Sequence, residues 1–91
     1  MPKFVIERDL PGAGALTDDD IRGISEKSNG VIEDLGGDVQ WLHSYVTADK
    51  ITCIYIAPNE ARVREHARCG GFPATAVLQV ARVIDPTTGG R

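Results

Sequence analysis

The stretch EHARCGGFP near the end of the chain places a carboxylate, an imidazole and a thiol within five positions. On a helix, His66 and Cys69 are three residues apart and therefore lie on neighbouring turns of one flank. Imidazole and thiolate ligands suit nickel, copper or zinc, and Glu65 could add a carboxylate. Two ligands cannot close a tetrahedral site, and Glu65 is also spaced to pair with Arg68. The alternative is that His66 packs at the edge of an apolar stripe and that Cys69 only fills space.

A second group of candidate ligands lies in two segments that are typical of a β-hairpin. His43 and Tyr45 would face Cys53 and Tyr55 if the turn held three residues, whereas a two-residue turn would separate the two sets. Glu7, in the first strand, is the nearest carboxylate. Such a set could bind a soft divalent ion, or it could hold an organic ligand with His43 as general base and a tyrosine as donor. The third interpretation is interface packing, in which each polar group meets one hydrogen-bond partner.

Hydrophobic periodicity and turn residues divide the chain into six elements that would position these side chains. Extended patterns predict four strands, and helical spacing with N-caps at Thr17 and Asn59 predicts two helices. The strands fall at 3–10, 38–46, 50–57 and 76–85, and the helices at 16–37 and 58–71. This β-α-β-β-α-β order predicts an α+β, ferredoxin-like fold, with a four-stranded antiparallel sheet and both helices on one face. We expect one domain over residues 1–85 and a loose tail over 86–91.

The two central strands carry apolar or aromatic residues on both alternating sets, which is typical of strands covered on two sides. Alternation predicts that one face holds Trp41, His43 and Tyr45, and the other Leu42, Ser44 and Val46. Helices cover only one face of the predicted sheet, so a second subunit is expected to cover the other and to bury the set that contains Trp41. The sequence therefore predicts a homodimer of the dimeric α+β barrel type.

Composition argues against several classes of protein. Of the 91 residues, 42% are hydrophobic and 25% charged, as in an ordinary soluble domain. A net charge of −3 argues against nucleic-acid binding. No apolar run approaches the roughly 20 residues of a membrane span, and the N-terminus lacks the apolar segment of a secretory signal. The two cysteines are then expected to be free thiols, in a cytoplasmic protein with neither membrane nor nucleic-acid partners.

Several long stretches of the chain resemble one family of small bacterial domains. They are VIERDLPGAG, QWLHSYVTADKITCIYIAPNEARVREHARCGGFP and VIDPTT, which together cover nearly the whole chain. These stretches are similar to the DUF4242 family, and the resemblance implies a ferredoxin-like dimer. It also implies nickel binding, because a Streptomyces member is described as a nickel-binding protein proposed to sequester the metal. Cys69 departs from the family pattern, which has arginine there, so a site that depends on Cys69 would be peculiar to this protein.

The leading interpretation is a cytoplasmic homodimer that binds nickel or another divalent transition-metal ion, with metal sequestration or detoxification as its role, and that is not an enzyme. Its candidate ligands are His43, His66, Glu65, Cys53, Cys69 and Glu7. The alternative is a small-ligand-binding protein or an enzyme of the dimeric α+β barrel type. That alternative uses a pocket lined by His43, Tyr45 and Tyr55.

Overall fold

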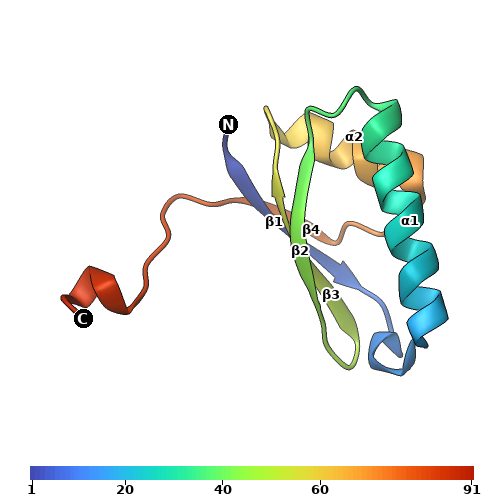
Figure 1. Ribbon diagram of the computed structural model, residues 1–91, viewed down its shortest axis with the longest axis horizontal. Coiled ribbons are helices and arrows are strands. Elements are labelled where there is room, and N and C mark those ends of the chain that lie inside the picture. The colour runs from blue at the N-terminus through green and yellow to red at the C-terminus, as the bar shows by residue number, and fades with distance from the viewer.

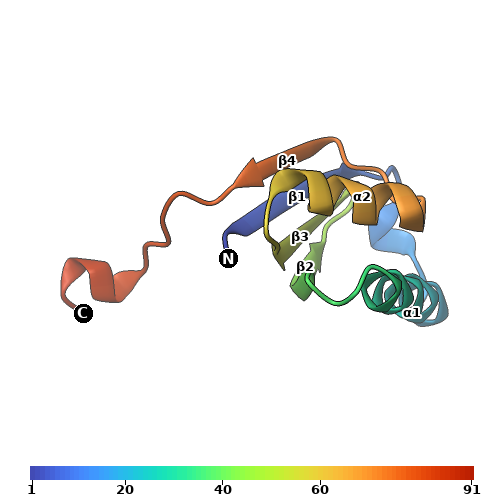
Figure 2. The same ribbon diagram turned by 90° about the horizontal axis from the view of Figure 1, so that it is seen from above.

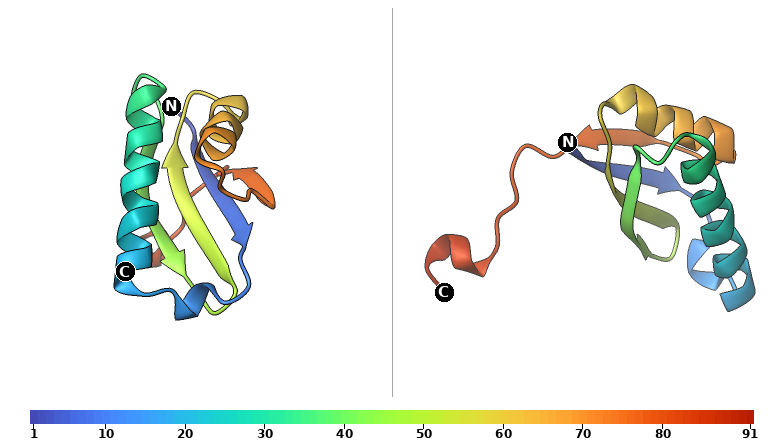
Figure 3. Two further views of the ribbon diagram at one scale, coloured as in Figure 1. Left: turned by 90° about the vertical axis from the view of Figure 1, so that its right-hand side faces the viewer. Right: turned by 45° about the horizontal axis from the view of Figure 1, so that its top comes forward.

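The computed structural model describes residues 1–91 and consists of one four-stranded antiparallel sheet with two helices on one of its faces (Figures 1 and 3). The strands are β1 (Lys3–Asp9), β2 (Gln40–Val46), β3 (Lys50–Ile56) and β4 (Ala76–Gln79). The helices are α1 (Asp18–Asp34) and α2 (Glu60–Gly70), with short 3-10 turns at Ala13–Ala15 and Pro86–Gly89. The strand order is β2-β3-β1-β4, with every neighbouring pair antiparallel. The predicted ferredoxin-like fold is confirmed.

The helix boundaries follow the predicted capping residues. Thr17 accepts a hydrogen bond from the backbone N–H of Asp20, whose carboxylate accepts one from the N–H of Thr17, so the two form a reciprocal capping box. The side chain of Asn59 caps α2 by accepting from the N–H of Arg62. Helix α2 ends at Gly71, where a φ of 68° requires the left-handed conformation that glycine adopts without strain.

The helix-covered face of the sheet carries the core. Alternate residues of β1 and β3 point to this face and are buried, and Val39 and Val63 pack against them from outside the sheet. Phe4, Ile6, Val39 and Val63 are each at most 1% exposed. The buried strand residues of this face are Phe4, Ile6, Arg8, Ile51, Cys53, Tyr55 and Val77. Arg8 is the one charged residue among them, and it bears on the site described below.

The opposite face of the sheet is covered by neither helix (Figures 2 and 3), and we refer to it as the open face. Strand register places two rows of side chains across all four strands of the open face. One row is Leu78, Val5, Ile54 and His43, and the other is Ala76, Glu7, Thr52 and Tyr45. The open face therefore combines an apolar centre with an imidazole, a phenol and a carboxylate.

The last strand is shorter than predicted. β4 ends at Gln79 rather than at residue 85, and residues 81–91 are all exposed. This segment runs away from the body of the domain and ends in a short turn at the far left of Figure 1. Val83 and Ile84 are 65% and 72% exposed along it. Two large apolar side chains are therefore left uncovered by the rest of the chain.

Candidate functional site

The turn of the β2–β3 hairpin decides which predicted ligands share a face. The N–H of Thr47 donates to the carbonyl of Lys50 over 2.9 Å, so only two residues, 48–49, form the turn. Tyr45 consequently pairs with Thr52, not with Cys53. Because side chains alternate along each strand, His43 and Tyr45 lie on the open face while Cys53 and Tyr55 lie on the helix-covered face. The three-residue alternative, which would have joined the two sets, does not occur.

A register shift in β2 corrects a second expectation. Pairing jumps from Trp41 opposite Tyr55 to His43 opposite Ile54, so one extra residue is inserted between them. The insertion moves Trp41 to the helix-covered face, where its indole N–H donates to the Ser44 hydroxyl over 2.9 Å. The predicted common face of Trp41 with His43 and Tyr45 is wrong, because regular alternation is broken at this bulge.

The open face presents the accessible histidine of the chain. The ring of His43 is exposed and stands edge-on to that of Tyr45, with 5.1 Å between their centroids. Glu7 lies in the same row as Tyr45, with Thr52 between them. The nearest cation to Glu7 is Lys50, whose Nζ is 3.9 Å from Oε2, and the Glu7 side chain is 40% exposed. A pair this exposed and this long contributes little stability and leaves the carboxylate available to another cation.

His66 and Cys69, two of the three candidate ligands on α2, do not act as a pair. His66 is fully buried, whereas Cys69, one turn further along the helix, is exposed to solvent. Nε2 of His66 lies 3.3 Å from the Ser28 hydroxyl of α1, and Nδ1 has no hydrogen-bond partner. Burial lowers the pKa of His66, and the nearby Arg8 guanidinium lowers it further. His66 therefore acts in the core as a neutral imidazole that joins α2 to α1.

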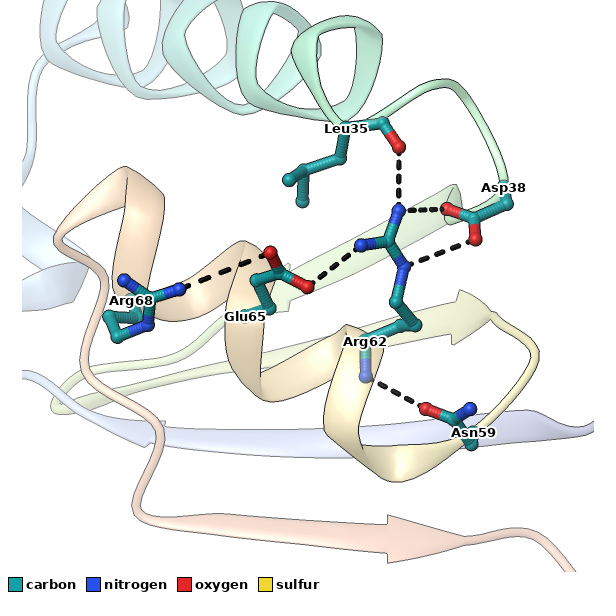
Figure 4. A network of polar contacts seen from close by, with 6 residues as sticks. All are labelled: Leu35, Asp38, Asn59, Arg62, Glu65 and Arg68. Carbon is teal, nitrogen blue, oxygen red and sulfur yellow. Dashed lines mark hydrogen bonds and ion pairs between the residues drawn. The ribbon is translucent and has the colours of Figure 1, made fainter.

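Glu65 is held in a network of ion pairs that runs along α2 and reaches Asp38, which follows the end of α1 (Figure 4). Its Oε2 accepts from Nη1 of Arg62 over 2.7 Å, and its Oε1 lies 4.0 Å from the Arg68 guanidinium. Arg62 also donates twice to the Asp38 carboxylate and once to the carbonyl of Leu35. Hydrogen bonding to Arg62 lowers the pKa of Asp38. The network links α2 to the end of α1, and it occupies the carboxylate that was predicted to bind metal.

A cavity of about 300 Å³ lies between α1 and the helix-covered face of the sheet. Its walls are mostly apolar: Leu10, Ile21, Ile24, Trp41, Val46, Ile51 and Phe72 line it, together with Cys53, Tyr55, Pro73, Arg8 and three serines. Burial raises the pKa of Tyr55 and outweighs the opposing effect of the Ser28 hydroxyl. Of the predicted pocket residues, Tyr55 lines this cavity, while His43 and Tyr45 lie on the other side of the sheet. The predicted pocket of these three residues is therefore corrected.

Arg8 is the residue of this cavity that the sequence reasoning missed. It is 5% exposed, its Nε donates to the Cys53 thiol over 3.4 Å, and its Nη1 donates to the carbonyl of Pro73. Its guanidinium also lies over the Phe72 ring, 5.5 Å from the centroid. The signal was present in the strand pattern, since Arg8 follows Phe4 and Ile6 at spacings of two and therefore had to point inward.

Within one chain the six predicted metal ligands do not converge. His43 and Glu7 are on the open face, Cys53 and His66 are buried on the helix side, and Glu65 and Cys69 are on the outer part of α2. No three histidine, cysteine, aspartate or glutamate side chains are grouped as they would be around a metal ion. The chain by itself therefore does not bring three of the predicted ligands together.

The fold and these surfaces define a small ferredoxin-like α+β domain with an uncovered sheet face. The chain belongs to the family of nickel-responsive proteins similar to SCO4226, whose family model matches residues 4–80. It is similar to the crystal structure of SCO4226 from Streptomyces coelicolor A3(2), with a TM-score of 0.76. The match has 16% identity and covers 90% of this chain and 99% of that one, so it confirms the fold.

Two further observations concern relatives and membrane association. The search of curated proteins gave no match. None of the helices is both long and apolar enough to cross a membrane. The family that matches carries the SCO4226-like description, and the DUF4242 assignment stays a prediction.

Proposed function

We propose that this protein binds nickel, or a similar divalent transition-metal ion, between the open faces of two copies of the chain. The observation that carries the proposal is the position of His43. It is one of two histidines in the chain, and its imidazole is exposed while that of His66 is fully buried. Membership of a nickel-responsive family supports a metal-related role. Sequestration of the ion in the cytoplasm is the role that we propose.

The proposed ligands are His43 and Glu7, with Tyr45 beside them. One imidazole and one carboxylate from each of two copies would give two nitrogen and two oxygen ligands. A symmetric dimer doubles any set of ligands on its shared face, since each subunit presents the same surface. Nitrogen and oxygen ligands in a tetragonal arrangement suit Ni²⁺ and Cu²⁺. The proposal thus keeps two of the six predicted ligands, which are the two that share an uncovered face.

The second copy is proposed on two further grounds. The centre of the open face is apolar, with Val5, Ile54 and Leu78 in one row, and Leu78 is 53% exposed. Val83 and Ile84 extend beyond the body of the domain, where a partner chain could cover them. Contiguous apolar surface of this kind is typical of an interface. We propose that the interface belongs to a homodimer.

Replacing His43 by alanine is expected to lower nickel affinity at least about tenfold, because the substitution removes a metal ligand. Even the mutation of a residue that only hydrogen-bonds to a metal ligand lowers metal affinity by about tenfold or more. Isothermal titration of tag-free protein with NiCl₂ measures the effect. Glu7→Gln is expected to weaken binding less, since it keeps an oxygen ligand but removes its charge. The matched control is His66→Gln, which should retain nickel binding because His66 is buried. Unchanged affinity and stoichiometry in His43→Ala would refute the proposed site.

Replacing Ile54 by glutamate is expected to convert the proposed dimer to a monomer. Ile54 lies at the middle of the open face, between Val5 and His43 of the neighbouring strands. Two unpaired carboxylates at a two-fold interface would be desolvated against each other, which is strongly unfavourable. Light scattering after size-exclusion chromatography gives the mass directly. Asn29→Glu, an exposed change on α1, should remain dimeric, and a monomeric wild-type protein would overturn the interface.

A further inference from the structure

The cavity on the helix-covered face contains a buried cation without a counter-ion. Arg8 is more than nine-tenths buried, and none of the ion pairs in the molecule involves it. Its Nη2 has no hydrogen-bond partner, whereas Nε and Nη1 have one each. Arginine stays charged in proteins, and a buried charge is costly unless it is paired and hydrogen-bonded. One charged donor of this guanidinium therefore has no partner within the chain.

The chemistry of the walls restricts what could pair with this guanidinium. Nine of the fourteen lining residues are hydrophobic, three of the others are serines, and none of the fourteen carries a carboxylate that could pair with Arg8. A highly charged anion such as a phosphate monoester would meet one free donor and an apolar wall, so most of its charge would be unpaired. A single carboxylate on an apolar body satisfies both the cation and the walls.

We infer that this cavity binds a small apolar monocarboxylate, with Arg8 as the residue that pairs with the carboxylate. This site is separate from the proposed metal site, because it lies on the other face of the sheet. Nη2 is covered by surrounding atoms, so pairing with a carboxylate requires the segment that covers the guanidinium to shift. Phe72 lies over the guanidinium and the Pro73 carbonyl accepts from it, and both residues line the cavity. Ligand entry and a movement of this turn are therefore coupled.

The chain offers a direct reporter of occupancy. Trp41 is the single tryptophan of the sequence and it lines the cavity. We would titrate the full chain with octanoate, octan-1-ol and octylammonium in metal-free buffer containing EDTA, and follow Trp41 emission and the melting temperature. Octanoate is expected to give a saturable signal and a higher melting temperature. Octan-1-ol is expected to bind at least about tenfold more weakly, and octylammonium not at all, because only the carboxylate pairs with the cation.

Two variants make the assignment specific. Arg8→Met removes the charge while keeping much of the side-chain volume, and it should reduce octanoate affinity to that of octan-1-ol. Arg64→Met is the matched control, since Arg64 is exposed on α2 and pairs with Glu60. Ile24→Phe keeps Arg8 but narrows the cavity, and it should weaken the binding of octanoate. This variant tests the site independently if Arg8→Met fails to fold.

Three results would overturn the inference. They are the absence of a saturable signal at millimolar octanoate, equal affinities for octanoate and octan-1-ol, and unchanged octanoate affinity in a folded Arg8→Met protein. Because the titration contains no metal, each result is independent of whether nickel binds at the open face. Failure of the nickel titration would, in turn, leave the carboxylate site untouched.

Discussion

Replacing Phe4 by alanine is expected to lower the free energy of unfolding by about 3–5 kcal/mol. Phe4 is 1% exposed on the helix-covered face, where it pairs with Tyr55 across the β1–β3 ladder and belongs to the buried core cluster. Removing the ring deletes buried apolar surface and leaves a void that the neighbouring strands cannot fill by small shifts. A domain of this size has a total stability of only about 5–15 kcal/mol, so the variant should be close to unfolding at body temperature.

Urea unfolding at one fixed protein concentration measures this difference, since the stability of a dimer would depend on concentration. The control is Glu26→Ala, which removes atoms from an exposed side chain of α1, away from the open face. That change should alter stability by less than about 0.5 kcal/mol in the monomeric fold. A loss below about 1 kcal/mol for Phe4→Ala would mean that the core is not centred on this face.

The fold could be predicted from the sequence because its signals are local. The helical spacing of residues 16–37, the capping residues Thr17 and Asn59, and the alternation in β1 each depend on neighbours within a few positions. Each element therefore lies within a few residues of its predicted range. The exception is β4, which was expected to reach residue 85 but pairs with β1 only as far as Gln79. Strand ends depend on whether a partner strand is present, and β1 begins at Lys3, so no partner exists beyond that point.

The candidate site was less predictable because it depends on register. One inserted residue between Trp41 and His43 moves the indole to the opposite face of the sheet, and the sequence contains no glycine or proline there to mark it. The β2–β3 turn in the segment TADK (47–50) could contain two or three residues. The hydrogen bond from the N–H of Thr47 to the carbonyl of Lys50 shows that it contains two. A single step in register exchanges every side chain between faces. The spacing of residues alone therefore could not predict whether His43 lies close to Cys53.

The two faces of the sheet separate two kinds of chemistry. The open face has exposed ligands for a metal and an apolar centre that suits a second copy of the chain. The helix-covered face has a cavity with a buried cation, and a histidine that joins the two helices behind it. The two inner strands, β1 and β3, contribute to the centre of both faces through alternate residues. Variants of β3 should therefore affect one face or the other according to whether the residue number is even or odd.

Acidification from about pH 7.5 to about pH 5.5 is expected to destabilise the protein through His66. Burial lowers its folded-state pKa below the ordinary 6.5, so the unfolded chain takes up a proton that the folded chain does not. The contribution of the neutral imidazole to the free energy of unfolding is therefore fully present above pH 6.5, and it is lost as the pH falls below that value. The uptake of one such proton changes the free energy of unfolding by at most about 1.4 kcal/mol per pH unit.

His66→Gln removes the titrating group and should remove this slope, although the variant has a lower stability at every pH through lost packing with Tyr55 and Phe72. Chemical unfolding of both proteins across the pH series gives the difference directly. The paired carboxylate of Asp38 does not disturb the comparison, because Arg62 lowers its pKa and it titrates well below this range. Equal slopes in the two proteins would mean that His66 gains its proton in the folded state. In that case Ser28 and the neighbouring rings would have to admit an imidazolium beside the Arg8 guanidinium, which the like charges oppose.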